Sequence, residues 1–318
     1  MTALWALVVI INKRVLADID PLAVNFFVRI ASIAGLLLIT LPLTALRLWD
    51  NGFGINAAAG WMALAAVTTW LIAFSAYYYA LRGERVAVMA PILSTDPLWT
   101  ALFAWLIIGS TFGLLTLAGM AVAMAGVLLI TRWMGAGDDA VLGALAGAAH
   151  GEVLPGPPAT SAAAPLRPGR LRLVALAVLA AAGWGLGPVF IDQASTAYGK
   201  PTATMMIMSQ ALGMVMLGAV LLGRRRPLTA RALDPPERRR VALLLALGGL
   251  LEACVSVLFF LAIAEIGPVL TMLIMATTPV FALVFGVAFL RERVGLRLVL
   301  AAAVTVIGVM LAALDGVS

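Results

Sequence analysis

The sequence predicts an all-α integral membrane protein with about ten transmembrane helices, arranged as two inverted five-helix repeats. The composition is the first reason: 63% of the 318 residues are hydrophobic, 11% are charged, and the mean hydropathy is +1.08. A soluble domain this apolar would lack the polar surface that keeps it in solution. The other two reasons are ten apolar runs of near-membrane length and an internal repeat.

The apolar runs are the predicted helices, since crossing the hydrocarbon core takes about 20 residues. The first run is short because Asn12, Lys13 and Arg14 interrupt it. Either this helix is tilted and its lysine snorkels, or the true start of the chain lies upstream. Residues 135–169 are rich in Gly, Ala and Pro and read as a flexible linker between repeats 1–134 and 170–318. The ten runs are 2–16, 22–46, 57–81, 87–108, 113–133, 171–191, 201–222, 241–264, 268–290 and 296–314.

The repeat emerges when residues 79–130 are shifted by 182 positions onto 261–312, which needs no gap. Twelve of the 52 pairs are then identical, and the aligned proline and glycines are more informative than the count. An odd number of helices in each half gives the halves opposite orientations, which is a transporter architecture with its site between the halves. The distinctive matched pairs are Pro97 with Pro279, Phe103 with Phe285, Gly113 with Gly295, and Gly126 with Gly308.

The chain resembles the EamA-type permeases of the drug/metabolite transporter superfamily. The resemblance is carried by AYYYALRGERVAVMAPILSTDPLWTALFAWLIIG with LAGMAVAMAGVLLI, and by LAIAEIGPVLTMLIMATTPVFALVFGVAFLRERVG with VTVIGVML. Arg291-Glu292-Arg293 approximates a turn typical of the family, whereas Gly109-Ser110-Thr111 departs from it. The resemblance implies ten helices, alternating access, a central cavity lined by the first four helices of each half, and a peripheral fifth and tenth helix.

The membrane orientation has two opposing indications. Loops after the odd-numbered runs, with their flanking helix ends, hold 18 of the 21 Lys and Arg residues. The positive-inside rule therefore places these loops in the cytoplasm and both termini outside. The family resemblance implies cytoplasmic termini. We lean to the charge pattern because it runs through the whole chain.

Two acids, Asp96 and Glu252, fall near the middle of predicted spans. A charge at that depth costs about 2.5–3.5 kcal/mol on insertion scales, so each acid needs a partner, a wet cavity or a proton. The alternative is a protonated or hydrogen-bonded structural acid. Helical spacing places Trp99 and Phe103 on the face of Asp96.

Aromatic residues form a second stripe on the third span, at Trp70, Phe74 and Tyr77. An acid beside aromatic faces suits an organic cation, although single aromatics more often pack helices. The candidate substrate-binding or proton-coupling residues are therefore Asp96, Glu252, Trp99, Phe103, Trp70 and Tyr77.

Three further features have both a structural and a functional interpretation. Mid-span prolines, here Pro97 and Pro279, bend helices and free backbone carbonyls. Arg29 in the second span either pairs with an intramembrane acid, binds an anionic part of a substrate or snorkels to the interface, and we favour the interface or a structural pair. GWGLGP, residues 183–188, lies in a membrane helix, where close helix packing is the better explanation than a phosphate loop.

These features predict a permease that moves a small organic metabolite or drug-like solute across the cytoplasmic membrane by alternating access, with an acid that can couple transport to protons. The alternative is a membrane-embedded enzyme or scaffold subunit. One cysteine and one histidine provide neither a disulfide nor a histidine metal cluster. We therefore expect no catalytic residues, metal or cofactor. The expected partners are the solute and membrane lipid, without nucleic acid, for a multi-pass monomer or homodimer.

Overall fold

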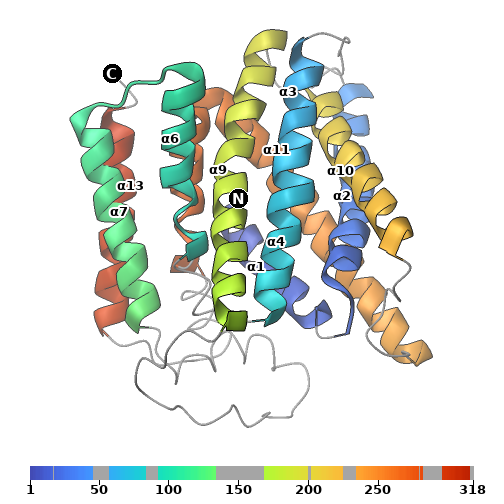
Figure 1. The fold of residues 1–318 in the computed structure, drawn as a ribbon. Coiled ribbons are helices and arrows are strands. Elements are labelled where there is room, and N and C mark those ends of the chain that lie inside the picture. Colours follow the sequence, from blue (N-terminus) through green and yellow to red (C-terminus); the bar gives the residue numbers. More distant parts are fainter. Residues whose placement is uncertain are drawn as a thin grey trace.

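A computed structural model shows a bundle of helices whose axes run broadly along one direction (Figure 1). Every secondary-structure element in the described part of the chain is helical. The described residues are 1–16, 18–45, 57–83, 92–133, 168–199, 202–224, 234–278, 280–281 and 296–315.

The helices agree in position with most of the predicted apolar runs. Those before the predicted linker are α1 (Thr2–Val15), α2 (Pro21–Ala45), α3 (Ala57–Ala65), η1 (Ala66–Ala73), α4 (Phe74–Gly83), α6 (Asp96–Ile108) and α7 (Leu114–Trp133). Those after it are α9 (Pro168–Tyr198), α10 (Ala203–Arg224), α11 (Pro235–Met275) and α13 (Leu296–Asp315).

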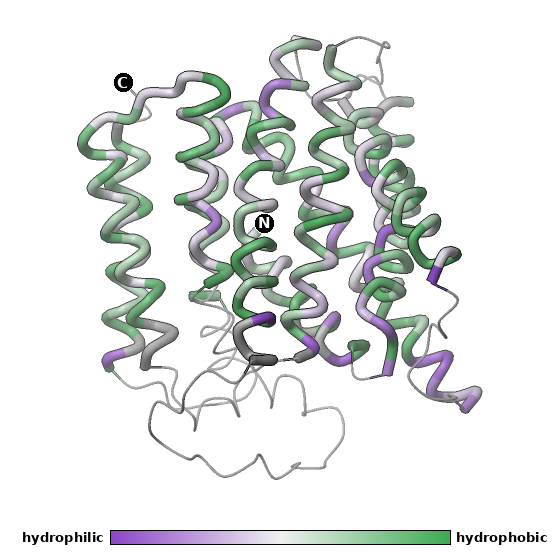
Figure 2. Tube along the Cα trace, viewed as in Figure 1, coloured by the Kyte–Doolittle hydropathy of each residue, from purple (hydrophilic) through white to green (hydrophobic). Residues whose placement is uncertain are grey.

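Five helical stretches in the described residues are long and apolar enough to cross a membrane: Pro21–Leu43, Ala57–Arg82, Arg172–Tyr198, Ala203–Arg224 and Pro235–Met275. Three shorter apolar helices accompany them, at Asp96–Ile108, Leu114–Leu129 and Val299–Leu314. The outward face carries many large hydrophobic side chains, with Leu38, Leu114 and Leu222 strongly exposed. Figure 2 shows hydrophobic colouring along the helices, with hydrophilic patches mainly near their ends. Such a surface suits hydrocarbon rather than water.

The third predicted span, 57–81, is one continuous helical stretch whose centre is not α-helical. Residues Ala66–Ala73 form a π-helix between α3 and α4. A π-helix shifts backbone hydrogen bonds to i→i+5 and re-aims the side chains that follow. This segment contains Trp70, which lies at the candidate site described below.

The fourth predicted span, 87–108, differs from the expectation at its centre. Residues 94–95 form a turn, and α6 begins at Asp96 with Pro97 in its first turn. Asp96 therefore occupies a helix start, and the expectation of continuous helix through it was wrong. The physical reason is Pro97, which has no N–H to donate and is tolerated at a helix start, where that donor has no partner anyway.

The turn before Pro97 has a counterpart 182 residues later. Thr95 donates its amide and its hydroxyl to the Ile92 carbonyl, at 3.1 and 2.7 Å. Thr277 makes the same two bonds to the Ile274 carbonyl, at 3.0 and 2.7 Å. The repeat-related segments thus share the same local hydrogen bonds. Pro279, the other predicted kink, lies outside the described residues.

The predicted eighth and ninth spans meet at a sharp break inside α11. Gly267 has φ +76° and ψ 168°, a conformation that only glycine adopts readily, and Pro268 follows it. The two predicted runs, 241–264 and 268–290, are separated at this glycine. Residues 282–295 lie outside the described part.

Helices α7 and α13 pack side by side at one edge of the bundle (Figure 1). A Cβ placed on Gly126 would lie 2.8 Å from the Thr305 Cα, and one on Gly308 would lie 2.6 Å from the Ala123 Cα. A shift of 182 residues converts each contact into the other, so the two helices contact through matching positions. Small residues permit this close approach, as is usual between membrane helices.

Candidate polar site in the helical bundle

The centre of the candidate site is an ion pair between Arg29 of α2 and Glu252 of α11. The side chains are 0% and 2% exposed, so both charges are withdrawn from solvent. Of the possibilities considered for Arg29, the structure shows pairing with an intramembrane acid. Removing either partner alone would leave an uncompensated buried charge, which is strongly destabilising.

Two aromatic rings of the third span lie against the Arg29 guanidinium. Its Cζ atom lies 4.2 Å from the Trp70 ring centroid and 4.9 Å from that of Phe74. The two rings stack on each other with centroids 5.1 Å apart. The sequence predicted an acid and aromatic faces around an external organic cation. At Glu252 and Trp70 the cation is instead Arg29 of the protein itself.

Close packing of α2 against α11 brings the ion pair together. A Cβ placed on Gly249 of α11 would lie 2.8 Å from the Ser32 amide nitrogen. A Cβ placed on Gly35 of α2 would lie 2.8 Å from the Ala253 Cβ. Gly249 lies three residues from Glu252 and Gly35 lies six residues from Arg29, so the two glycines let the helix backbones approach near the ion pair.

Hydrogen bonds extend from Trp70 to helices α2 and α10. The Trp70 indole Nε1 donates to the Ser209 Oγ at 2.8 Å, and the Trp70 carbonyl accepts from the Asn25 Nδ2 at 2.8 Å. This carbonyl belongs to the π-helix, where shifted backbone bonding favours such side-chain partners. Nearby, the Gln210 Nε2 donates to the Ser256 Oγ at 3.0 Å. Polar groups from four helical elements therefore converge here.

The cluster also contains buried polar atoms that have no hydrogen-bond partner among the described residues. Burying such atoms without a partner costs about 1–3 kcal/mol each, so they commonly mark a site for water or a ligand. Donors and acceptors are both represented around the ion pair. The unpartnered atoms here are Arg29 Nε and Nη1, Glu252 Oε2, Asn25 Oδ1, Ser32 Oγ and Gln210 Oε1.

Tyr77, another predicted site residue, belongs to the aromatic cluster beside this polar site. Its ring lies 4.8 Å from that of Trp184 and 6.3 Å from that of Phe74, measured between centroids. Its hydroxyl is buried and has no partner in the described structure. The adjacent Tyr78 hydroxyl accepts a hydrogen bond from the Asn12 Nδ2 at 3.0 Å, which links the cluster to α1.

Asp96, Trp99 and Phe103 lie together on α6, against α9. A Cβ placed on Gly185 of α9 would lie 2.8 Å from the Thr100 amide nitrogen and 3.0 Å from the Asp96 carbonyl oxygen. The Trp99 and Phe103 rings stack at 6.1 Å between centroids. The Asp96 Oδ1 atom is buried without a partner. This acid differs from Glu252, because no ion pair neutralises it in the described part.

The GWGLGP segment of α9 is a packing surface, as the sequence indicated. A Cβ placed on Gly183 would lie 2.8 Å from the Ala73 Cβ and 3.0 Å from the Thr68 carbonyl oxygen. Gly187 faces the Thr69 hydroxyl. These glycines allow α9 to contact the π-helix and α6 closely. Among the described residues, no group of three or more His, Cys, Asp or Glu side chains could hold a metal ion.

Sequence reasoning missed most of the hydrogen-bonding partners. Asn25, Ser209 and Gln210 are neutral polar residues inside apolar runs, and their cost in hydrocarbon was an available signal. Asn25 lies four residues before Arg29, and Ser256 lies four after Glu252, so each pair shares a helix face. The partners across helices required the structure.

Comparison with known proteins identifies the family to which this chain belongs. The chain is similar over 98% of its length to 96% of a solved chain described as "Crystal structure of protein", with TM-score 0.64 and 15% sequence identity. This similarity concerns the fold alone. No curated protein matches significantly. The EamA-like transporter family matches residues 1–132 and 171–314. The chain is therefore a multi-pass membrane protein that belongs to the EamA-like transporter family.

Proposed function

We propose that this protein is a secondary transporter that moves a small organic solute across the cytoplasmic membrane by alternating access between two inverted repeats. The observation that carries the proposal is the buried Arg29–Glu252 pair with its unpartnered polar atoms. An intramembrane ionisable residue is costly, and its usual justification is a substrate or ion pathway.

The position of the pair supports this role. Arg29 belongs to α2, before the linker, and Glu252 to α11, after it. A site built from both halves opens toward one side of the membrane or the other when the halves rock against each other. Because the pair is buried, a solute reaches it only after such a movement.

Asp96 and Glu252 are the proposed proton-coupling groups. A carboxyl group that binds a proton in one conformation and releases it in another links solute movement to the proton gradient. Asp96 has a buried oxygen without a partner, and Glu252 can exchange Arg29 for a proton or solute. Trp70, Tyr77, Trp99 and Phe103 are proposed to contact the organic part of the solute.

The test uses the full chain in proteoliposomes with an imposed proton gradient. Uptake of a panel of labelled organic cations, amino acids and sugars is measured for the wild type, Asp96→Asn and Glu252→Gln. We expect gradient-driven uptake of at least one solute by the wild type, with rate and pH dependence altered in both variants. Wild-type rates with unchanged pH dependence in both variants would refute the role of these acids. Absence of uptake for every solute favours the enzyme or scaffold alternative.

A further inference from the structure

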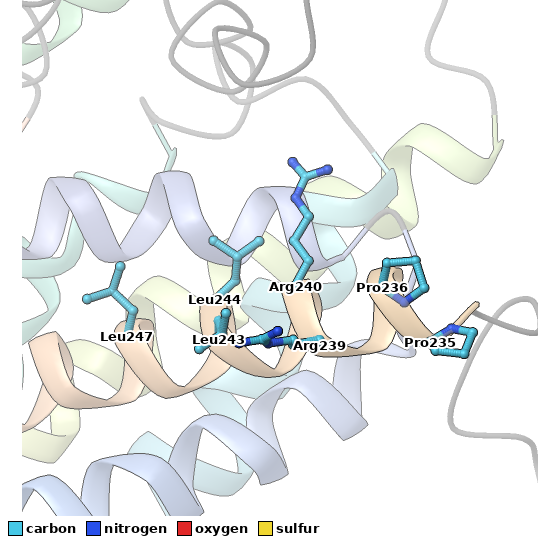
Figure 3. Close-up of a pocket in the computed structure, with 7 residues that line it drawn as sticks. All are labelled: Pro235, Pro236, Arg239, Arg240, Leu243, Leu244 and Leu247. Atoms are coloured by element: carbon cyan, nitrogen blue, oxygen red, sulfur yellow. The ribbon is translucent and has the colours of Figure 1, made fainter.

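A groove with two chemically different ends lies on the surface of α11, away from the Arg29–Glu252 pair. It is lined by Pro235, Pro236, Arg239, Arg240, Leu243, Leu244 and Leu247. Figure 3 shows these side chains along the first turns of the helix, with the prolines and arginines toward its start and the leucines farther along. A rise of 1.5 Å per residue separates Arg240 and Leu247 by about 10 Å along the helix axis.

The groove lies where the helix changes from charged to apolar. Helix α11 begins with a capping box between Asp234 and Glu237. The chain continues through Arg238, Arg239 and Arg240 and is then apolar from Val241 to Leu251. In Figure 2 this end of α11, at the lower right, is hydrophilic and the following turns are hydrophobic. Such a change marks the level at which a membrane helix passes the lipid headgroups.

A second helix brings more positive charge to the same level. Helix α1 packs against α11, and Arg14 of α1 lies close enough to Arg240 for their charges to repel. Arginines at the headgroup level favour an anionic occupant at this end of the groove. The leucine end of the groove is uncharged, and its Leu243 and Leu247 side chains are 62% and 48% exposed. These side chains need an apolar occupant.

We propose that this groove binds an anionic phospholipid, with the phosphate at Arg239 and Arg240 and an acyl chain along the leucines. Lipid surrounds a membrane protein at this depth, and the arginines select anionic headgroups over zwitterionic ones. The leucine end distinguishes a lipid from a free phosphate, which has no apolar part to bury. The proposal does not depend on the transport function.

The test measures binding to the purified full chain in detergent micelles by native mass spectrometry. Phosphatidylglycerol and phosphatidylcholine with identical acyl chains are compared for the wild type and for Arg239→Gln/Arg240→Gln. We expect tighter binding of phosphatidylglycerol by the wild type. We expect the variant to bind it roughly thirtyfold more weakly, since each arginine near an anionic lipid contributes a factor of about five.

The matched control is Arg172→Gln/Arg297→Gln, which removes two exposed arginines from α9 and α13. Its net charge equals that of Arg239→Gln/Arg240→Gln. It should bind phosphatidylglycerol as the wild type does. Leu243→Ala/Leu247→Ala should weaken lipid binding and leave the binding of inorganic phosphate at the wild-type level. Three results would each overturn the proposal. The first is equal binding of the two lipids by the wild type, and the second is an equal loss of phosphatidylglycerol binding in both arginine variants. The third is full competition by inorganic phosphate together with wild-type lipid binding in the leucine variant.

Discussion

Arg29 and Glu252 form an ion pair across 223 residues of sequence, between α2 and α11, with both side chains buried. Trp70 and Phe74 lie against the Arg29 guanidinium, and Gly35 and Gly249 bring α2 and α11 close together near the pair. It therefore connects two helices from distant parts of the chain and holds two charges inside the bundle. The predictions below separate these two roles.

Removing one member of the pair should destabilise the protein more than removing both. Glu252→Gln should lower the free energy of unfolding by about 3 kcal/mol, because Arg29 stays buried without its counter-charge. Arg29→Met/Glu252→Leu should lower it by about 1 kcal/mol or less. The free energy of unfolding of the single and double variants is measured in mixed micelles. Equal losses in the single and double variants would contradict a buried, mutually neutralising pair.

Trp70 should contribute through both its ring and its indole N–H. Trp70→Phe keeps an aromatic face over Arg29 but loses the hydrogen bond to Ser209, which should cost about 1 kcal/mol. Trp70→Leu also loses the cation–π contact, a further loss of about 1–2 kcal/mol. Trp61→Phe is the control, because Trp61 stacks on Phe190 at 5.7 Å and packs against a different hydrophobic cluster from Trp70. Equal free energies of unfolding for Trp70→Phe and Trp70→Leu would show that the cation–π contact does not contribute to stability.

The close approach of α2 and α11 should make Gly249 intolerant of a methyl group. A Cβ there would lie 2.8 Å from the Ser32 amide nitrogen, so Gly249→Ala should destabilise the protein by about 2 kcal/mol. Gly60→Ala is the matched substitution, because a Cβ on Gly60 of α3 meets nothing within 4 Å. It should be stabilising by up to about 1 kcal/mol, since alanine is the better helix former. Similar effects in the two variants would argue against this helix contact.

Substitution of Asp96, unlike that of Glu252, should change transport without lowering the stability of the protein. Its Oδ1 is buried without a partner, so the neutral amide of Asp96→Asn should leave the free energy of unfolding unchanged or raise it by about 1 kcal/mol. The same variant should lose the pH dependence of solute uptake if Asp96 binds the coupled proton. A loss of stability as large as that of Glu252→Gln would show that Asp96 is a structural acid with a partner.

The helical class followed from the length and composition of the apolar runs, because hydrocarbon permits few alternatives to the helix for an apolar chain. Local backbone geometry was less predictable. The spacing of Trp70, Phe74 and Tyr77 assumed an α-helix, whereas Trp70 lies in a π-helix. The start of α6 at Asp96 was missed because Pro97 was interpreted as a bend within a helix rather than as the first turn of a new one.

The candidate site was predictable in its residue types but not in its pairing. Glu252 and Trp70 were identified from an acid and aromatics at depth, yet the cation beside them is Arg29 of the protein. Pairing depends on which helix faces meet, and that is decided by small residues such as Gly35 and Gly249 in long-range contacts. Glycines occur throughout the sequence, so their pattern alone did not identify this contact.

The most direct test of alternating access is the accessibility of the polar site from each side of the membrane. The chain has one cysteine, Cys254, so Cys254→Ala gives a cysteine-free background. Ser256→Cys then reports on the site, since Ser256 is buried and accepts a hydrogen bond from Gln210. Pro236→Cys, at the exposed start of α11, serves as the control for sidedness.

Each variant is labelled with a membrane-impermeant methanethiosulfonate reagent, added to the outside or enclosed within proteoliposomes of defined protein orientation. Transport by alternating access predicts that Ser256→Cys reacts from both sides and Pro236→Cys from one side only. Reaction of Ser256→Cys from a single side under every imposed gradient, with intact labelling of the control, would contradict alternating access at this site.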